Sequence, residues 1–289
     1  MVQDYVFPAT VAQAVDILAE SQGRARIIAG GTDLVLDMHD GKISADKLVD
    51  LRAIDGMQHI AEEDDFISIG ANVTHAQVVK SSLLRNHAPG LVDACRKVGS
   101  LQIRNVATVV GNVVNGNPAA DAAVALACLD AQATVVDQHG TKVVPFDELY
   151  AGICLSCIDS CCQVVTHISF PKKKDGEGSA YVRMEQRKAL SLPMLNVSAK
   201  VRVVNNTFEE TQLLMAPVGA GPQHAVTAEE FLRGAEITDE NIKQAGKLAR
   251  EQATFRSSAV RGSKEYRIGV LPVCIERVLR AAIADAQQG

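Results

Sequence analysis

Two adjacent glycines directly after a short apolar segment are the feature that most constrains this chain. Ala25 to Ile28 have the composition of a buried strand, and Ala29-Gly30-Gly31-Thr32-Asp33 follow at once. Glycine has no Cβ, so backbone N–H groups in such a turn can converge on an anion. The spacing is not G-x-G-x-x-G, so a Rossmann fold is not indicated. Taken alone, a plain strand-to-helix turn is the commoner explanation of these residues.

A second stretch, residues 102–121, mixes Asn and Gly with small apolar residues just before a long apolar run. Small residues allow a ligand to approach the backbone closely. Thr108 and the backbone amides can donate to phosphate oxygens, and Asp121 can accept from ribose hydroxyls. The alternative is a surface loop in which Asn favours turns. The valines interleaved with the polar residues make a merely solvated loop the weaker alternative.

Composition excludes several classes of protein. The 289 residues are 47% hydrophobic and 22% charged, which is typical of a globular chain with two or three compact units. A net charge of −5 does not suit a nucleic-acid-binding protein. We see no membrane-spanning apolar run and no signal peptide, so we expect a cytoplasmic protein. Aromatic residues are only 4% and Trp is absent, so a flat cofactor would contact backbone and aliphatic side chains.

The periodicity along the chain predicts an α+β protein. Capping-box spacing predicts helices that begin after Thr10 and Thr74, and helical spacing recurs at residues 240–253 and 263–286. Pro272 is expected to kink or interrupt the last of these helices. Asn205-Asn206 between two apolar segments predicts a β-hairpin, and the polar residues 171–178 predict a linker.

Together, the two stretches resemble the FAD-binding subunits of the molybdenum hydroxylases of the xanthine dehydrogenase type, which include the medium subunits of carbon monoxide dehydrogenase. That family has an A-G-G-x-x-L turn near the N-terminus, then a Q-I-R-N-x-A-T-x-G-G-N segment followed by Ala-Asp. The matching residues here are Ala29 to Leu34, Gln102 to Thr108, Gly111-Asn112 and Ala120-Asp121. Residues 256–258 and 263–267 also look like the family's C-terminal domain. The order, the spacing and the total length all fit.

The resemblance implies a two-subdomain FAD-binding fold of the vanillyl-alcohol-oxidase/PCMH type. Residues 1–55 and 56–172 would be the two subdomains. Residues 173–289 would be a C-terminal flavoprotein domain, built from a small sheet with helices.

The resemblance also implies an electron-transfer role with no catalytic side chain in this subunit. One partner subunit would hold a molybdenum cofactor and oxidise a purine such as xanthine, or a related N-heterocycle. Another would hold [2Fe-2S] clusters, and FAD bound here would pass electrons from these clusters to NAD⁺. We expect a duplicated heterotrimer that neither binds nucleic acid nor inserts into a membrane.

The implied FAD site draws on both stretches. Its diphosphate and ribityl chain would lie across residues 28–32 and 108–112, and Val98 would lie beside the flavin ring. Arg183 stands where relatives place a lysine near the cofactor, although a solvated strand residue is as good an interpretation. The predicted cofactor-binding residues are Ile27, Ile28, Ala29, Gly30, Gly31, Thr32, Asp33, Val98, Thr108, Val109, Gly111, Asn112, Asn115, Asp121 and Arg183.

Two positions depart from the family pattern. Val110 replaces the first glycine of the G-G-N segment, and Ser191 replaces an Asp. If the first glycine contacts the cofactor, Val110 must point away or the backbone path must differ. A scaffold subunit without flavin is therefore one alternative function. A stand-alone flavoprotein dehydrogenase is another, although the glycine motifs lack a His or Glu for catalysis.

Four cysteines are clustered in the sequence at Cys154, Cys157, Cys161 and Cys162. An iron–sulfur site with three of them plus Cys128 or a partner residue is conceivable. Adjacent side chains diverge, however, so one cluster would be difficult for Cys161 and Cys162 to share. We expect reduced thiols in a connecting segment, and no metal bound by the isolated chain.

Overall fold

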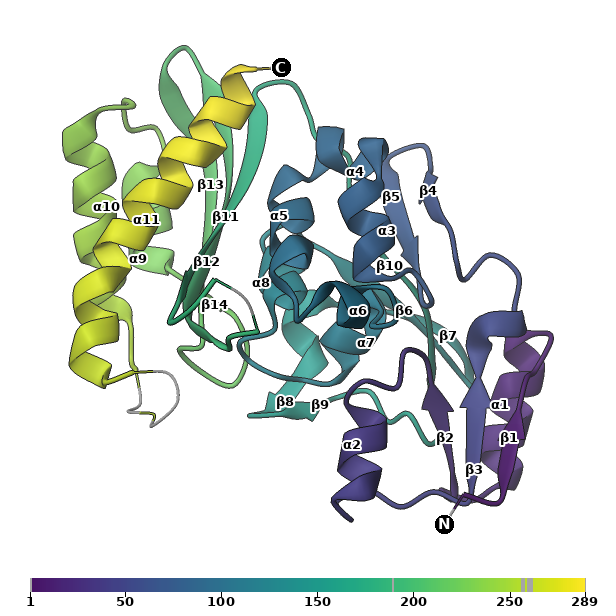
Figure 1. Cartoon of the computed structure of the whole chain (residues 1–289). Helices are drawn as coiled ribbons and strands as arrows, with labels where there is room; N and C mark the ends of the chain where they lie inside the picture. Colours follow the sequence, from purple (N-terminus) through teal and green to yellow (C-terminus); the bar gives the residue numbers. More distant parts are fainter. Residues whose placement is uncertain (1, 189, 256–257, 259–261, 289) are drawn as a thin grey trace.

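The fold consists of three larger β-sheets with helices between and around them, seen in a computed structural model (Figure 1). The structure describes residues 2–188, 190–255, 258 and 262–288. Arg256 and Ser257, which carry part of the C-terminal resemblance, lie outside the described residues. Within the described residues, no helix is long and apolar enough to cross a membrane.

The first sheet is small, parallel and formed by the N-terminal residues. Its strands, in spatial order, are β1 (Asp4–Val6), β3 (Lys47–Asp50) and β2 (Ala25–Ile28). Helix α1 (Val11–Glu20) begins where the Thr10 side chain accepts from the Gln13 amide, and it buries Val15 and Leu18. Helix α2 (Leu34–His39) follows β2, so the Gly30-Gly31 turn connects a buried strand to a short helix.

The second sheet is antiparallel, and its order brings together strands from distant parts of the sequence. The order is β4 (Ile60–Glu62), β5 (Phe66–Gly70), β10 (Val164–Pro171), β6 (Gln132–Asp137) and β7 (Gly140–Pro145). Six short helices connect β5 to β6: α3 (His75–Lys80), α4 (Ser82–His87), α5 (Pro89–Lys97), α6 (Leu101–Arg104), α7 (Val109–Val114) and α8 (Asp121–Ala127). A small hairpin of β8 (Tyr150–Gly152) and β9 (Leu155–Ser156) precedes β10.

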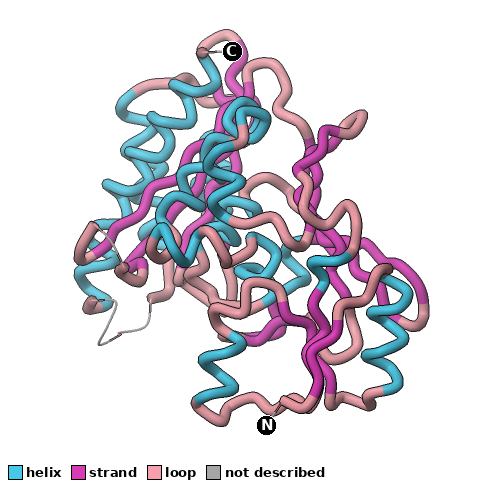
Figure 2. The backbone as a smooth tube through the Cα atoms, turned by 45° about the vertical axis from the view of Figure 1, so that its right-hand side comes forward, coloured by secondary structure: helices cyan, strands magenta, loops and turns pink. Residues whose placement is uncertain are grey.

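The third sheet is antiparallel and has helices on both faces. Its strands are β11 (Glu177–Glu185), β12 (Pro193–Val204), β13 (Thr207–Ala216) and β14 (Gln223–His224). The helices that follow are α9 (Val226–Leu232), α10 (Asp239–Gln252) and α11 (Lys264–Gln287). Helix α11 packs on one face, while α5 and α8 of the preceding part contact the other (Figures 1 and 2). The sheet therefore connects the two halves of the molecule.

The predicted hairpin is confirmed. Strands β12 and β13 pair antiparallel up to the turn, with one register shift between Arg202 and Val203, and Asn205 and Asn206 in the turn have φ values of 49° and 60°. Two consecutive positive φ angles are those of a type I′ turn, and Asn tolerates them better than most residues. The capping box at Thr74 is also confirmed, because its side chain and that of Gln77 bond each other's backbone amides.

Two predictions about the C-terminal half were wrong in detail. The linker is shorter than expected, since Pro171 ends β10 and β11 begins at Glu177. The expected interruption at Pro272 is wrong, because the last helix runs unbroken as α11, while a kink at Pro272 stays a prediction. Its residues Leu271 and Ile275 are fully buried, so packing of this face compensates the hydrogen bond that proline cannot make.

The predicted α+β class is confirmed. The three larger sheets take their strands from residues 4–50, 60–171 and 177–224. The division into folding units at 55/56 and 172/173 stays a prediction.

The contact between β11 and α11 depends on Gly178. A Cβ on Gly178 would lie 2.2 Å from the carbonyl oxygen of Ala282 and 2.3 Å from the amide nitrogen of Ala286. We expect Gly178→Ala to lower the free energy of unfolding by about 1–3 kcal/mol, because the helix must move off the sheet. Urea unfolding measures the change.

Gly269→Ala, in the exposed part of α11, is the matched control. A Cβ there meets nothing within 4 Å, so alanine should raise stability by about 0.5–1 kcal/mol through its helix propensity. Equal effects of the two substitutions would show that α11 does not press on Gly178.

Candidate functional site

A cleft of about 920 Å³ lies where the three parts of the chain meet. This volume is near the upper end of the range of roughly 300–1,000 Å³ typical of cofactor sites. Its walls come from residues 26–37, 98–121, 154–165 and 190–193, together with Arg183. All the predicted cofactor-binding residues except Val109 line it. Val109 lies in the hydrophobic core with no exposed surface, so its side chain is not available to a ligand.

The first glycine turn leaves a row of backbone donors free. Within the described chain, no hydrogen-bond partner is found for the amides of residues 30–33. Gly31 has φ +67°, and this left-handed conformation turns successive amides toward one side. The Thr32 hydroxyl is 3.5 Å from the Asp33 carboxylate and is otherwise exposed. A turn with several unpaired backbone N–H groups suits a diphosphate, because these groups can donate hydrogen bonds to anionic oxygens.

Gly30 has a different role from the one its motif suggests. A Cβ on Gly30 would lie 2.3 Å from the carbonyl oxygen of Val106. The absence of a side chain therefore lets the first turn pack directly against the backbone of the second stretch.

The second stretch contains the short helices α6 and α7, and turns connect them to each other and to α8. Thr108 caps α7 by accepting from the Gly111 amide at 3.0 Å. Val110, the departure from the family pattern, is 5% exposed and belongs to the hydrophobic core. Val110 also lines the cleft, but with so little exposed surface its side chain takes up little of it. The Asn112 Oδ1 atom at the cleft wall is buried and has no partner.

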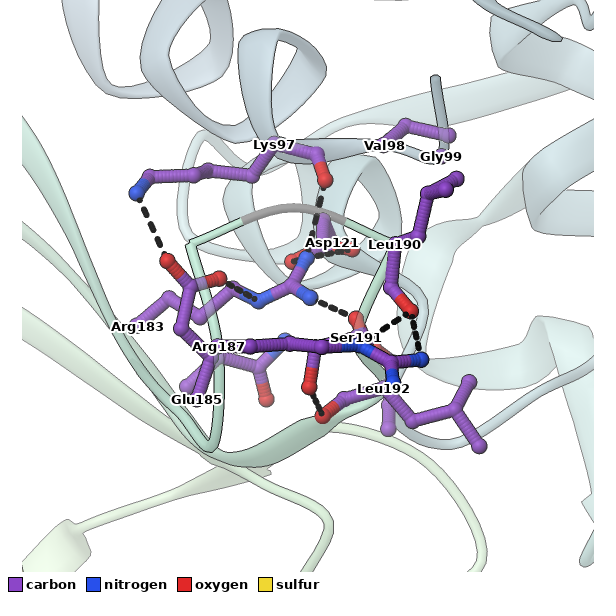
Figure 3. Close-up of polar contacts among 12 residues, drawn as sticks. Lys97, Val98, Gly99, Asp121, Arg183, Glu185, Arg187, Leu190, Ser191 and Leu192 are labelled. Atoms are coloured by element: carbon purple, nitrogen blue, oxygen red, sulfur yellow. Dashed lines mark hydrogen bonds and ion pairs between the residues drawn. The ribbon is translucent and has the colours of Figure 1, made fainter.

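Asp121 is buried and paired across the boundary between the halves (Figure 3). The Nη1 atom of Arg183 lies 2.9 Å and 3.0 Å from its two carboxylate oxygens. The Tyr181 hydroxyl also donates to Asp121, and Asn196 donates to Tyr181 at 3.1 Å. Burial raises the pKa of Asp121, while the charge of Arg183 acts in the opposite direction. These bonds already engage both oxygens of the Asp121 carboxylate. The expected hydrogen bond from a ribose hydroxyl to Asp121 stays a prediction.

Arg183 is buried, with its side chain 2% exposed, so it is not a solvated strand residue. Besides Asp121, it donates to the carbonyls of Lys97 and Ser191, and its Nε lies 2.9 Å from Glu185 (Figure 3). Two carboxylates thus balance its charge. The geometry favours a positioning role. Arg183 holds the backbone of Lys97, which precedes Val98, and the backbone of the loop at Ser191.

The cysteine segment forms a wall of the same cleft, which the sequence did not predict. The carbonyl of Ser160 accepts from the Ile27 amide at 3.0 Å, and Gly116 approaches the backbone at Leu155-Ser156. Cys154 and Cys157 line the cleft with exposed, unbonded thiols. Among the described residues, no group of three His, Cys, Asp or Glu side chains is placed to hold a metal ion.

His75 also lines the cleft, and its place after a helix cap was the only signal for it in the sequence. Its ring has no exposed surface, and burial with the nearby charge of Arg104 lowers its pKa to about 4.

Comparison with known proteins identifies the class. The family described as FAD binding domain in molybdopterin dehydrogenase matches residues 1–173. The family described as CO dehydrogenase flavoprotein C-terminal domain matches residues 179–282. The cleft, with the unpaired amides of residues 30–33 on its wall, therefore lies in a two-part protein of a flavoprotein family.

Relatives are similar over nearly the whole chain. A xanthine dehydrogenase FAD-binding subunit from Escherichia coli O157:H7 is 28% identical over 96% of this chain and 95% of its own length. The carbon monoxide dehydrogenase medium chain of Afipia carboxidovorans is also 28% identical, over 98% of each chain. A crystal structure of the Cu,Mo-CO dehydrogenase in a cyanide-inactivated form superposes with a TM-score of 0.91 at 26% identity, covering 99% of each chain. The chain belongs to the family of FAD-binding domains in molybdopterin dehydrogenases, and it is a medium, FAD-binding subunit of the molybdenum hydroxylase type.

Gly30→Ala tests the contact between the two stretches. We expect it to reduce FAD bound per chain and to lower stability by about 1–3 kcal/mol, because the Cβ collides with the Val106 carbonyl. Gly152→Ala, whose Cβ would meet only Leu155 at 3.7 Å, should change neither. Flavin absorbance per chain and thermal unfolding measure both effects. Full FAD content in Gly30→Ala would contradict the steric explanation.

The depressed pKa of His75 predicts acid destabilisation. Between its ordinary pKa of 6.5 and its folded pKa of about 4, the unfolded chain binds the proton more tightly than the folded chain. The free energy of unfolding should therefore fall by about 3 kcal/mol as pH decreases through this range. Urea unfolding of wild type and His75→Gln at pH 7.5, 6 and 5 isolates the contribution. Parallel pH profiles would show that His75 titrates normally.

Proposed function

We propose that this chain binds FAD in the cleft and relays electrons from the [2Fe-2S] clusters of a partner subunit to NAD⁺. In the complex, a subunit with a molybdenum cofactor would oxidise xanthine or a related N-heterocycle. The single observation that carries the proposal is the cleft between both halves of the chain, with the unpartnered amides of residues 30–33 on its wall. The names of the relatives support the choice of cofactors and partners.

The chain's own residues would hold and shield the cofactor. The amides of residues 30–33 would bind the diphosphate, and Asn112 would accept from a hydroxyl of the ribityl chain. Val98 would lie against the flavin ring, held in place because Arg183 bonds the preceding carbonyl. When bound, FAD supplies the exchange of hydride and single electrons. The protein contributes position and exclusion of water, so no acid–base side chain is needed.

One observation counts against a flavin-less scaffold subunit. Val110 motivated that alternative. It lines the cleft, but its side chain is packed in the core and only 5% exposed, so it takes up little of the space for a ligand. The relatives with xanthine and with carbon monoxide in their names are equally similar, at 28% identity each. The N-heterocycle substrate rests on the resemblance to the xanthine dehydrogenase subunits, and a duplicated heterotrimer in the cytoplasm remains part of the proposal.

The purified single chain should carry about one FAD and should oxidise NADH with an artificial dye, because that half-reaction needs only flavin. It should not oxidise xanthine, since that step belongs to the molybdenum subunit. Flavin absorbance, dye reduction and native mass spectrometry of the whole complex measure these properties. Purine oxidation by the single chain, or a flavin-free complex with full activity, would refute the relay.

A further inference from the structure

Two of the four clustered cysteines lie on the wall of the cleft, and the other two do not. Cys154 and Cys157 are exposed and line the cleft, whereas Cys161 and Cys162 are not among its lining residues. The remaining cysteines are buried in the hydrophobic cores, namely Cys95, Cys128 and Cys274. A reagent that enters the cleft therefore meets two accessible thiols, and the proposed function assigns no role to them.

The turn that carries Cys154 is not explained by backbone preference. Ile153 and Cys154 form the two-residue loop between β8 and β9, where Gly152 pairs with Leu155 (Figure 1). Cys154 has a φ of 55°, a left-handed conformation that glycine or asparagine adopts readily and that is unfavourable for most other residues. The backbone conformation thus gives no reason for a cysteine at this position, and the reason must lie in its thiol.

The two cleft thiols are too far apart to bond each other. Leu155 and Ser156, which form β9, separate them along the chain. An extended strand advances about 3.3 Å per residue, so the two Cα atoms are about 10 Å apart, and a disulfide requires Cα atoms within about 7 Å. The Cys157 amide also donates to the Leu149 carbonyl at 2.9 Å, which holds Cys157 against the hairpin. Oxidation is therefore expected to join either thiol to an external thiol compound.

The cysteine segment is fixed beside the first glycine turn. The Ser160 carbonyl accepts from the Ile27 amide at 3.0 Å, and the Ser160 hydroxyl accepts from Nη1 of Arg26 at 3.3 Å. Arg26 itself lines the cleft and places a positive charge there. A small anionic compound in the cleft therefore meets a cation and the amides of residues 30–33 near the two thiols.

We propose that Cys154 and Cys157 are modification sites, at which a small anionic disulfide forms a mixed disulfide that excludes FAD from the cleft. The thiolate sulfur of the cysteine attacks one sulfur of the incoming disulfide. A new S–S bond forms, the old S–S bond breaks, and the released thiolate takes up the proton that the cysteine lost. The cysteine is thereby oxidised and half of the incoming disulfide is reduced to a thiol. This inference rests on the proposed binding of FAD in the cleft.

The test treats the deflavinated full-length chain with oxidised glutathione and compares FAD binding before and after treatment. Peptide mass spectrometry should find glutathione on Cys154 or Cys157. The Kd for FAD, measured by flavin fluorescence, should rise at least about tenfold in the modified chain, and dithiothreitol should restore it. Saturating FAD added first should slow modification of both cysteines at least about tenfold, because only the FAD-free chain reacts there.

Cys162 is the matched control, because it is exposed in the same segment but does not line the cleft. Its modification should be equally fast with and without FAD, and Cys162→Ser should keep the full response of FAD binding to oxidised glutathione. The double variant Cys154→Ser, Cys157→Ser should lose that response, judged against the same variant before treatment. Thermal unfolding of each treated chain separates exclusion of FAD from loss of the fold.

An unchanged Kd for FAD in a chain with glutathione on Cys154 and Cys157 would overturn the inference and leave the proposed function intact. Equally fast modification of these cysteines with FAD bound would also overturn it, as would an adduct that weakens FAD binding only by unfolding the chain. Failure of the untreated wild-type chain to bind FAD would refute the proposed function itself.

Discussion

The buried carboxylate of Asp121 is the constraint on which the arrangement of the two halves depends. A charge at this depth is tolerable only when it is paired and hydrogen-bonded, and every partner comes from the C-terminal half. Arg183 and Tyr181 stand two residues apart on β11, so both side chains project from the same face of the strand toward α8. Loss of one member of such a pair leaves an uncompensated charge. The ion pair thus makes the FAD-binding half and the C-terminal domain interdependent.

This pairing also decides how the cleft can bind an anion. Arg183 is engaged by Asp121 and Glu185, so little of its charge is left for a diphosphate. The free amides of residues 30–33 offer neutral donors, and Arg26 is a second cation on the cleft wall. In the proposed site, backbone groups would supply much of the contact with the cofactor. Binding then depends on the backbone path of the first turn more than on any single side chain.

Local patterns predicted local structure well. The capping box at Thr74 and the Asn205-Asn206 turn depend on neighbouring residues, so the sequence contains the information they need. The motif resemblance found most of the cleft residues, but the segment around Cys157 joined the cleft only through packing. Pro272 shows the opposite case, because burial of one helix face outweighed a local preference. The contact of His75 with Cys95 spans two helices and has no signature in the spacing of residues.

The glycine motif was identified correctly, but the physical reason for one of its glycines differs from the one that the sequence suggested. The sequence explains Gly30 by the approach of a ligand, while the structure explains it by the approach of the Val106 carbonyl. A subunit that had lost its flavin would still need Gly30, since its two stretches would still have to pack. The motif alone therefore indicates the fold and not the bound cofactor. The amides of residues 30–33, which have no partner within the described residues and lie on the cleft wall, are the stronger physical reason to expect an anionic ligand such as FAD.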